Sequence, residues 1–148
     1  QVTDPQNVGA IIRTFNFFGG KNLIITKDHS SEINGSLAKS ASGALENINI
    51  IKVPNLSMAL KNLRKKGFII IGLDENGDVL LHNTKDYRNE KKVLVMGSEG
   101  KGLRRLTREN CDFLVSIANN NNSDFNTLNV SVSSALALYE FMGSENNN

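Results

Sequence analysis

Five short apolar runs constrain the fold of this chain more than any other feature. None of them alternates strictly between apolar and polar residues; they are Leu23–Thr26, Ile50–Val53, Phe68–Leu73, Lys92–Met96 and Phe113–Ile117. Strands that carry apolar residues on both faces are buried on both faces, which is typical of a parallel sheet covered by helices. The runs therefore predict an α/β domain.

Helical patterns separate the runs, and the sequence marks several of their ends. Asp4-Pro5 predicts the start of a first helix, and Gly19-Gly20 predicts its end. Pro54-Asn55 and Gly67 bound a clear amphipathic helix, and a weak helix is expected over Ser36–Ala44. This alternation predicts a mostly parallel sheet with helices on both faces.

Two further helices are expected in the second half of the chain. A short basic helix follows Gly102, with Leu103 and Leu106 predicted to point inward. Apolar residues at helical spacing then trace one face of a last helix. That face consists of Leu128, Val132, Ala135, Leu136, Tyr139 and Met142.

Composition excludes several other classes of protein. A chain of 148 residues is expected to form one domain, and its net charge of +2 is too small to indicate a nucleic-acid binder by itself. The single cysteine, Cys111, excludes an internal disulfide and a cysteine-based zinc site, so we expect a semi-buried structural thiol. No apolar run approaches the roughly 20 residues of a membrane span. No carboxylate pair or metal-ligand cluster supports a hydrolase, and no metal is expected.

Three segments lie at helix starts or after apolar runs, where open α/β sheets bind their ligands. They are Asn7–Arg13, Met96–Gly102 and Thr127–Ser131. The glycine loop in the second segment lacks the glycine order of a Rossmann loop, and Gly102 after Lys101 excludes a P-loop. Taken alone, this loop is equally compatible with a tight turn. Arg13, Glu99 and Asn129, each taken singly, are compatible with solvated or helix-capping residues.

In combination, the three segments resemble the motifs of the SpoU (TrmH-like) RNA ribose 2′-O-methyltransferases. The resemblance rests on Asn7-x-Gly9-x-x-x-Arg13, on Gly97-Ser-Glu99-Gly100-x-Gly102-Leu103 and on Leu128-Asn129-Val-Ser131, which occur in the family's order. Ser40–Ala44 is also similar to the family. The resemblance covers nearly the whole chain, and three ordered motifs are far more specific than one.

The resemblance implies a SPOUT-type α/β fold whose C-terminal half forms a deep trefoil knot, and a homodimer with its sites near the subunit interface. Residues 1–143 would be the catalytic domain, lacking a first strand expected just before Thr3, and residues 144–148 a disordered tail. Aromatic residues of the first and last helices are candidates for the interface or for the core. They are Phe15, Phe17, Phe18, Tyr139 and Phe141.

The same resemblance implies S-adenosylmethionine as cofactor and an RNA ribose 2′-hydroxyl as methyl acceptor. The matching cofactor positions are Leu73, Met96, Gly97, Gly102, Ile117, Leu128 and Asn129. The matching catalytic positions are Arg13, Asn7, Glu99 and Asn129. Two roles remain open for Arg13: it holds a phosphate or the 2′-oxygen by bidentate donation, or it loses a proton at a desolvated interface.

Basic residues beside the glycine loop are expected to bind RNA together with Arg13, although a solvated helix face is the alternative. They are Lys101, Arg104, Arg105 and Arg108. Ribosomal RNA is favoured as substrate because Asp4–Thr14 is closest to the branch acting on large-subunit rRNA. A tRNA 2′-O-methyltransferase and a non-catalytic knotted RNA-binding module are the alternatives. An intracellular location is expected, cytoplasmic or organellar.

The chain departs from the family after the fifth run, where Ile117-Ala118-Asn119 replaces the usual Ile-Pro-Met. The asparagine tract Asn119–Asn122 then fills a loop that the family uses for its cofactor. This departure is the feature that speaks for the non-catalytic alternative.

Overall fold

The computed structural model describes residues 4–27, 39, 41, 43–97, 101–121 and 127–143. It contains an α/β arrangement in which every strand pair is parallel, as the apolar runs predict. The described residues contain no helix that is long and apolar enough to cross a membrane. Three of the sequence expectations lie wholly or largely outside the described residues: the helix over residues 36–44, Glu99, and the tail over residues 144–148.

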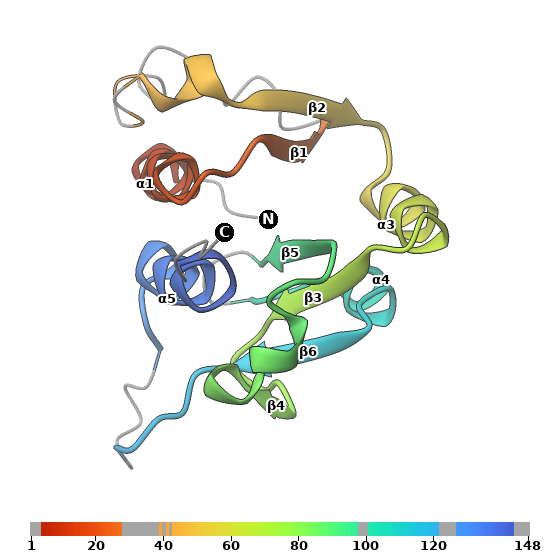
Figure 1. Cartoon of the computed structure of the whole chain (residues 1–148), viewed down its shortest axis with the longest axis vertical. Coiled ribbons are helices and arrows are strands. Elements are labelled where there is room, and N and C mark those ends of the chain that lie inside the picture. Colours follow the sequence, from red (N-terminus) through yellow and green to blue (C-terminus); the bar gives the residue numbers. More distant parts are fainter. Residues whose placement is uncertain are drawn as a thin grey trace.

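The larger sheet has four strands in the order β4-β6-β3-β5 (Figure 1). The two central strands are β3 (Ile69–Leu73) and β6 (Phe113–Ser116), and the two outer ones are β4 (Val79–Leu80) and β5 (Lys92–Met96). Short 3₁₀ turns at Leu81–Asn83 and Lys85–Tyr87 connect β4 to β5. Because the long strands are parallel, their carboxyl ends lie along one edge of the sheet.

A second sheet pairs β1 (Asn22–Thr26) with β2 (Asn49–Val53) in parallel. Helix α1 (Pro5–Phe17) and the 3₁₀ turn Ala44–Asn47 pack beside it, around the fully buried Ile12. The predicted start of α1 is confirmed, since the Asp4 side chain accepts a hydrogen bond from the Gln6 backbone N–H at 2.9 Å.

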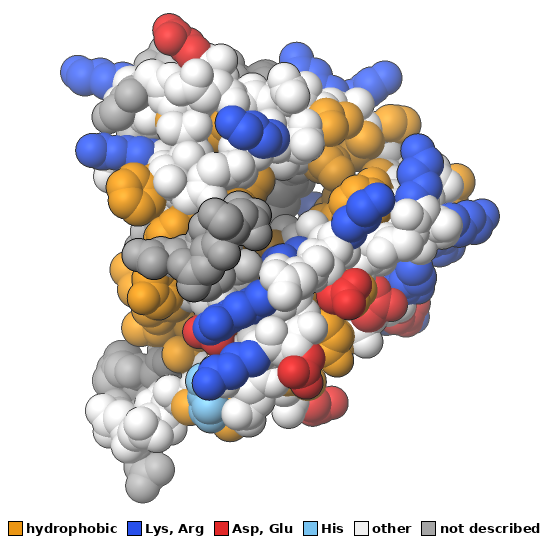
Figure 2. Space-filling model, in the orientation of Figure 1, with side chains coloured by type: hydrophobic (Ala, Val, Ile, Leu, Met, Phe, Trp, Pro, Cys, Tyr) orange, Lys and Arg blue, Asp and Glu red, His pale blue; other side chains and the backbone are white. Residues whose placement is uncertain are grey.

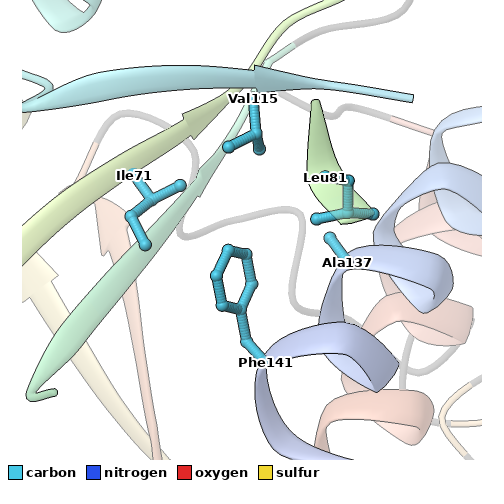
Figure 3. Packing of buried hydrophobic residues seen from close by; sticks show 5 residues of the cluster. All are labelled: Ile71, Leu81, Val115, Ala137 and Phe141. Carbon is cyan, nitrogen blue, oxygen red and sulfur yellow. The ribbon is translucent and has the colours of Figure 1, made fainter. Parts of the chain in front are cut away.

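Helices cover both faces of the four-stranded sheet. On one face, α3 (Leu56–Lys65) and the segment leading into α4 (Arg105–Glu109) pack around Leu60, Ile70, Val95 and Leu103. On the other face, α5 (Val130–Met142) packs its Ala137 and Phe141 against Ile71 and Val115 (Figure 3). Helix α1 also lies against α5. The last helix therefore packs against α1 from the first half of the chain and against the four-stranded sheet.

Two expectations about inward faces are wrong. Leu106 is 57% exposed, and α4 instead buries Thr107. The predicted face of α5 is largely its outer face, because Leu128, Val132, Leu136 and Tyr139 are exposed while Ser134, Ala137, Leu138 and Phe141 are buried. Phe141 is therefore a core residue of the single chain.

Candidate functional site

Three of the expected cofactor residues meet at the carboxyl ends of the parallel strands. Leu73, the last residue of β3, is in register with Met96, the last residue of β5. On its other side Leu73 is in register with Val115 of β6, so Ile117 follows two residues beyond that pairing. The edge thus presents apolar side chains from three adjacent strands, where open α/β sheets hold their ligands.

The loop after β5 brings two backbone segments into direct contact. An ideal Cβ on Gly97 would lie 2.3 Å from the carbonyl carbon of Gly102 and 2.7 Å from the backbone nitrogen of Leu103. No side chain fits in that space, so glycine is required by close approach. Gly102 has φ +64°, a conformation that glycine adopts without strain. Gly97 and Gly102, which flank the glycine loop, are therefore in backbone contact, and we refer to this contact as the glycine cradle.

A buried carboxylate fastens this loop to the end of β3. The Asp74 side chain is 4% exposed and lies 3.3 Å from Arg108 Nη2 through its Oδ2. Its Oδ1 accepts a hydrogen bond from the Asn76 backbone N–H at 2.9 Å. The same Arg108 nitrogen lies 3.5 Å from the Leu103 carbonyl oxygen. Arg108 is thereby held by protein groups, whereas the sequence predicts it as an RNA contact.

Helix α5 brings the third motif close to the strand ends. Asn129 caps the helix and accepts hydrogen bonds from the backbone N–H and hydroxyl of Ser131, at 2.8 and 2.6 Å. The fully buried Ser134 donates a hydrogen bond from Oγ to Met96 Sδ at 3.2 Å. At 1.5 Å rise per residue, Asn129 lies within two turns of this contact. Leu128, which precedes it, is 50% exposed.

The first motif lies on α1 and not among the strand ends. Gly9 is buried, Asn7 is half-buried and Arg13 is exposed. Arg13 follows Gly9 by four residues and so shares its side of the helix. Within the described residues, no hydrogen bond or ion pair joins Arg13 to Leu73, Met96 or the glycine loop. The described residues therefore bring the predicted cofactor positions Leu73 and Met96 together with no polar contact to the predicted catalytic arginine.

The remaining predicted residues divide by exposure. Lys101, Arg104 and Arg105 are exposed beside the glycine loop, as expected of RNA contacts. Within the described part of the chain, no group of three His, Cys, Asp or Glu side chains is placed to hold a metal ion. Burial raises the pKa of the Cys111 thiol to about 11, which suits the predicted structural thiol and not a nucleophile.

Sequence reasoning missed two residues of this site, Asp74 and Ser134. Asp74 had a readable signal, because a carboxylate directly after an apolar run stands at the ligand-binding edge of a parallel sheet. Ser134 had none, since its burial depends on which face of α5 meets the sheet.

An α/β fold with a glycine cradle at the carboxyl ends of its strands defines a class of ligand-binding proteins, and the comparisons with known proteins narrow that class. A sequence model described as the SpoU rRNA Methylase family matches residues 1–139. The chain belongs to this family.

Curated relatives include the 23S rRNA (guanosine-2′-O-)-methyltransferase RlmB of Pseudomonas aeruginosa, which is 40% identical over 141 residues. That alignment covers 95% of this chain and 55% of the relative. The RlmB of Ralstonia nicotianae is 43% identical over 139 residues, which are 94% of this chain and 54% of the relative. The chain thus spans about half the length of the curated relatives it matches.

The fold matches solved structures of the same class. The SpoU methyltransferase AviRb from Streptomyces viridochromogenes superposes with a TM-score of 0.83 at 26% identity, covering 97% of this chain and 56% of AviRb. A second structure of AviRb, in complex with the cofactor AdoMet, gives a TM-score of 0.84 at 24% identity.

Proposed function

We propose that the chain catalyses transfer of a methyl group from S-adenosylmethionine (AdoMet) to a ribose 2′-hydroxyl of RNA. The observation that carries this proposal is the backbone contact between Gly97 and Gly102 next to the paired strand ends Leu73 and Met96. Membership of the SpoU rRNA Methylase family gives the reaction class. We further infer that residues 1–143 form the catalytic domain.

The residues present fit the cofactor. Because Gly97 carries no side chain, the backbone of Gly102 and Leu103 packs against it at close range. In this proposal, a ligand beside that contact meets a surface built mainly of backbone groups. Leu73, Met96 and Ile117 supply apolar contacts for an aromatic base. Arg108 beside this edge is paired with Asp74, which limits repulsion of a positively charged sulfonium. When bound, AdoMet supplies an activated methyl group.

The chain's own polar residues serve the acceptor. A ribose 2′-hydroxyl is a weak acid, so a group must stabilise the charge that develops on its oxygen. Arg13 suits this role through bidentate donation, because its guanidinium is exposed on α1. Asn7 and Asn129 orient the acceptor and the cofactor in this proposal, with Glu99 in the same site. Lys101, Arg104 and Arg105 hold the RNA backbone.

Large-subunit rRNA is the proposed substrate, because the RlmB relatives at 40% and 43% identity are named as 23S rRNA methyltransferases. Mapping ribose methylations in cells with and without the protein would identify the modified nucleotide. The altered Ile117-Ala118-Asn119 loop makes a non-catalytic module the alternative, and AdoMet binding separates the two.

We propose that the active species is a homodimer and that its interface uses the outer face of α5 and the end of α1. Four exposed apolar residues define this α5–α1 face: Phe17, Val132, Leu136 and Tyr139. Phe18 joins the two helices through edge contacts, with ring centroids 5.2 Å from Phe17 and 6.1 Å from Tyr139. Apolar side chains gather over α1 and α5 in Figure 2. A patch of this kind on one chain indicates a protein interface.

The dimer also accounts for the absence, among the described residues, of a hydrogen bond between Arg13 and the strand ends of its own chain. We further infer the C-terminal trefoil knot, in which α5 passes through the loop that precedes it. The buried Ser134 contact to Met96 supports this inference, since it fixes α5 directly beneath the end of β5.

Methyl transfer from labelled AdoMet to a 23S rRNA transcript tests the proposal. We expect incorporation by the wild-type chain, loss of at least a hundredfold in Arg13→Ala, and AdoMet affinity in that variant within threefold of wild type. Near-normal turnover by Arg13→Ala would remove Arg13 from the mechanism. Absence of AdoMet binding by the wild-type chain would favour the non-catalytic module.

A further inference from the structure

The charge of this chain is strongly asymmetric. Residues 47–73 contain five of its seventeen Lys and Arg and none of its fifteen Asp and Glu. Outside this segment, carboxylates outnumber the cations, so the net charge of +2 conceals one strongly basic stretch. The stretch contains β2, α3 and β3, and of these α3 is a helix at the surface.

Helix α3 and the residue that follows it present three of these cations to solvent. Lys61, Lys65 and Lys66 are exposed, and we refer to them as the α3 lysine face. Lys61 and Lys65 are four residues apart and therefore neighbours on one side of the helix. Within the described residues, none of the three has a carboxylate at ion-pair distance.

The remaining cation of α3, Arg64, has a structural task. Arg64 Nε lies 3.1 Å from Asp112 Oδ1, and the Arg64 guanidinium also donates to the Asn110 carbonyl oxygen. Asp112 in turn accepts a hydrogen bond from the Ile70 backbone N–H at 2.6 Å. Arg64 therefore pairs with the Asp112 carboxylate, while the α3 lysine face keeps its positive charge.

The α3 lysine face lies next to the cations of the proposed RNA site. Helix α3 and the segment leading into α4 cover the same face of the four-stranded sheet, where Leu60 and Leu103 pack in one cluster. Lys101, Arg104 and Arg105 lie at the start of that second element, so six exposed cations belong to two adjacent elements. Figure 2 shows basic side chains gathered around the position of α3.

We propose that the α3 lysine face binds the phosphate backbone of RNA and extends the track that begins beside the glycine loop. The inference rests on the proposed function for its ligand class. Lysine is a mobile point charge that contacts phosphates without reading bases, so this surface positions RNA and adds no sequence preference. Each contact releases condensed counterions, which makes its contribution to affinity depend on salt.

Filter binding of a 23S rRNA transcript to the full chain, between 50 and 200 mM salt, tests this surface. In the triple variant Lys61→Gln, Lys65→Gln, Lys66→Gln we expect affinity at 100 mM salt to fall at least tenfold. The slope of log affinity against log salt should decrease in magnitude by about 2–3, since each of the three lost phosphate contacts removes about 0.7–0.9. The maximal methyl-transfer rate at saturating RNA should stay within twofold.

A matched control removes the same charge elsewhere. Lys21, Lys85 and Lys91 are exposed and lie outside α3 and α4, so Lys21→Gln, Lys85→Gln, Lys91→Gln should change affinity less than threefold. Equal losses in both triple variants, or no loss in the α3 variant, would overturn the inference. Failure of the wild-type chain to transfer methyl groups, with the α3-dependent RNA binding intact, would instead contradict the proposed function alone.

Discussion

Gly97 is the residue at which one added methyl group has the clearest expected effect. The Cβ of Gly97→Ala would stand 2.3 Å from the Gly102 carbonyl carbon, so the glycine cradle must open. We expect AdoMet affinity, measured by titration calorimetry, to fall at least tenfold. Unfolding free energy should fall by about 1–3 kcal/mol, as in other overpacked sites.

The control for this variant is Gly19→Ala. Gly19 has φ +87° and open space around its Cβ position, so alanine there costs stability through backbone strain while leaving the cradle untouched. We expect a comparable loss of stability with unchanged AdoMet affinity. Equal affinity losses in the two variants would show that stability, and not the cradle, controls binding.

Cys111 tests the electrostatics of the interior. Because burial raises the pKa of this thiol to about 11, only about 0.1% of it is thiolate at pH 8. Alkylation by iodoacetamide should therefore be roughly a hundredfold slower than in the urea-unfolded chain.

The raised pKa of Cys111 also stabilises the fold below about pH 9, and this contribution is lost as pH rises through about 11. The variant Cys111→Ala should lose less stability over that range. Alkylation in the native chain within tenfold of the unfolded rate would contradict the burial.

At the scale of elements, Arg108 links the end of β3 to the glycine loop and α4. Because Asp74 is buried and Arg108 is half exposed, we expect a coupling free energy of about 1 kcal/mol in a double-mutant cycle of Asp74→Asn and Arg108→Gln. Each single variant should weaken AdoMet binding about fivefold through the displaced Leu103 segment. Chemical denaturation gives the coupling and calorimetry the affinity.

Arg105→Gln is the control for this cycle, since Arg105 is exposed on α4 and has no carboxylate partner among the described residues. It should weaken RNA binding and leave AdoMet affinity unchanged. A coupling below about 0.3 kcal/mol would mean that the pair is too well solvated to hold the loop.

Local signals predicted the ends of elements well and their inner faces poorly. The Asp4 cap, the Asn55 cap and the stop at Gly67 depend on residues within one turn, and all three are present. The faces of α4 and α5 depend on distant strands. Helix α5 has apolar residues around its whole circumference, so spacing alone does not decide whether Leu136 or Phe141 meets the sheet.

The candidate site was predictable to the extent that it follows from strand ends. Leu73 and Met96 end apolar runs, and parallel pairing then places them side by side. The contact between Gly97 and Gly102 was not predictable from the sequence. A loop glycine can be needed either for a positive φ or for close approach of another backbone segment, and the sequence does not distinguish the two. The ion pair between Asp74 and Arg108 was not predictable either, because the two residues are 34 positions apart and only the folded structure brings them together.

At the scale of the whole molecule, the misassigned face of α5 bears directly on assembly. A row of apolar residues that spacing assigns to a core is exposed in the single chain, and it adjoins Phe17, which is 81% exposed. Both observations are accounted for if the face is buried in a second copy. The helical spacing of apolar residues along α5 would then mark a subunit interface and not the core of one chain.

Charge insertion on the α5–α1 face tests this arrangement. Leu136→Glu with Tyr139→Glu would place two unpaired carboxylates from each subunit in an apolar interface, so dimer affinity should fall at least a hundredfold, which is about 3 kcal/mol. Light scattering coupled to size-exclusion chromatography should give a dimer mass for wild type and a monomer mass for the variant. Met58→Glu adds a charge at another exposed apolar residue, on α3, and should leave the dimer intact. A wild-type monomer, or a double variant that remains dimeric, would assign the exposed row of α5 to another partner.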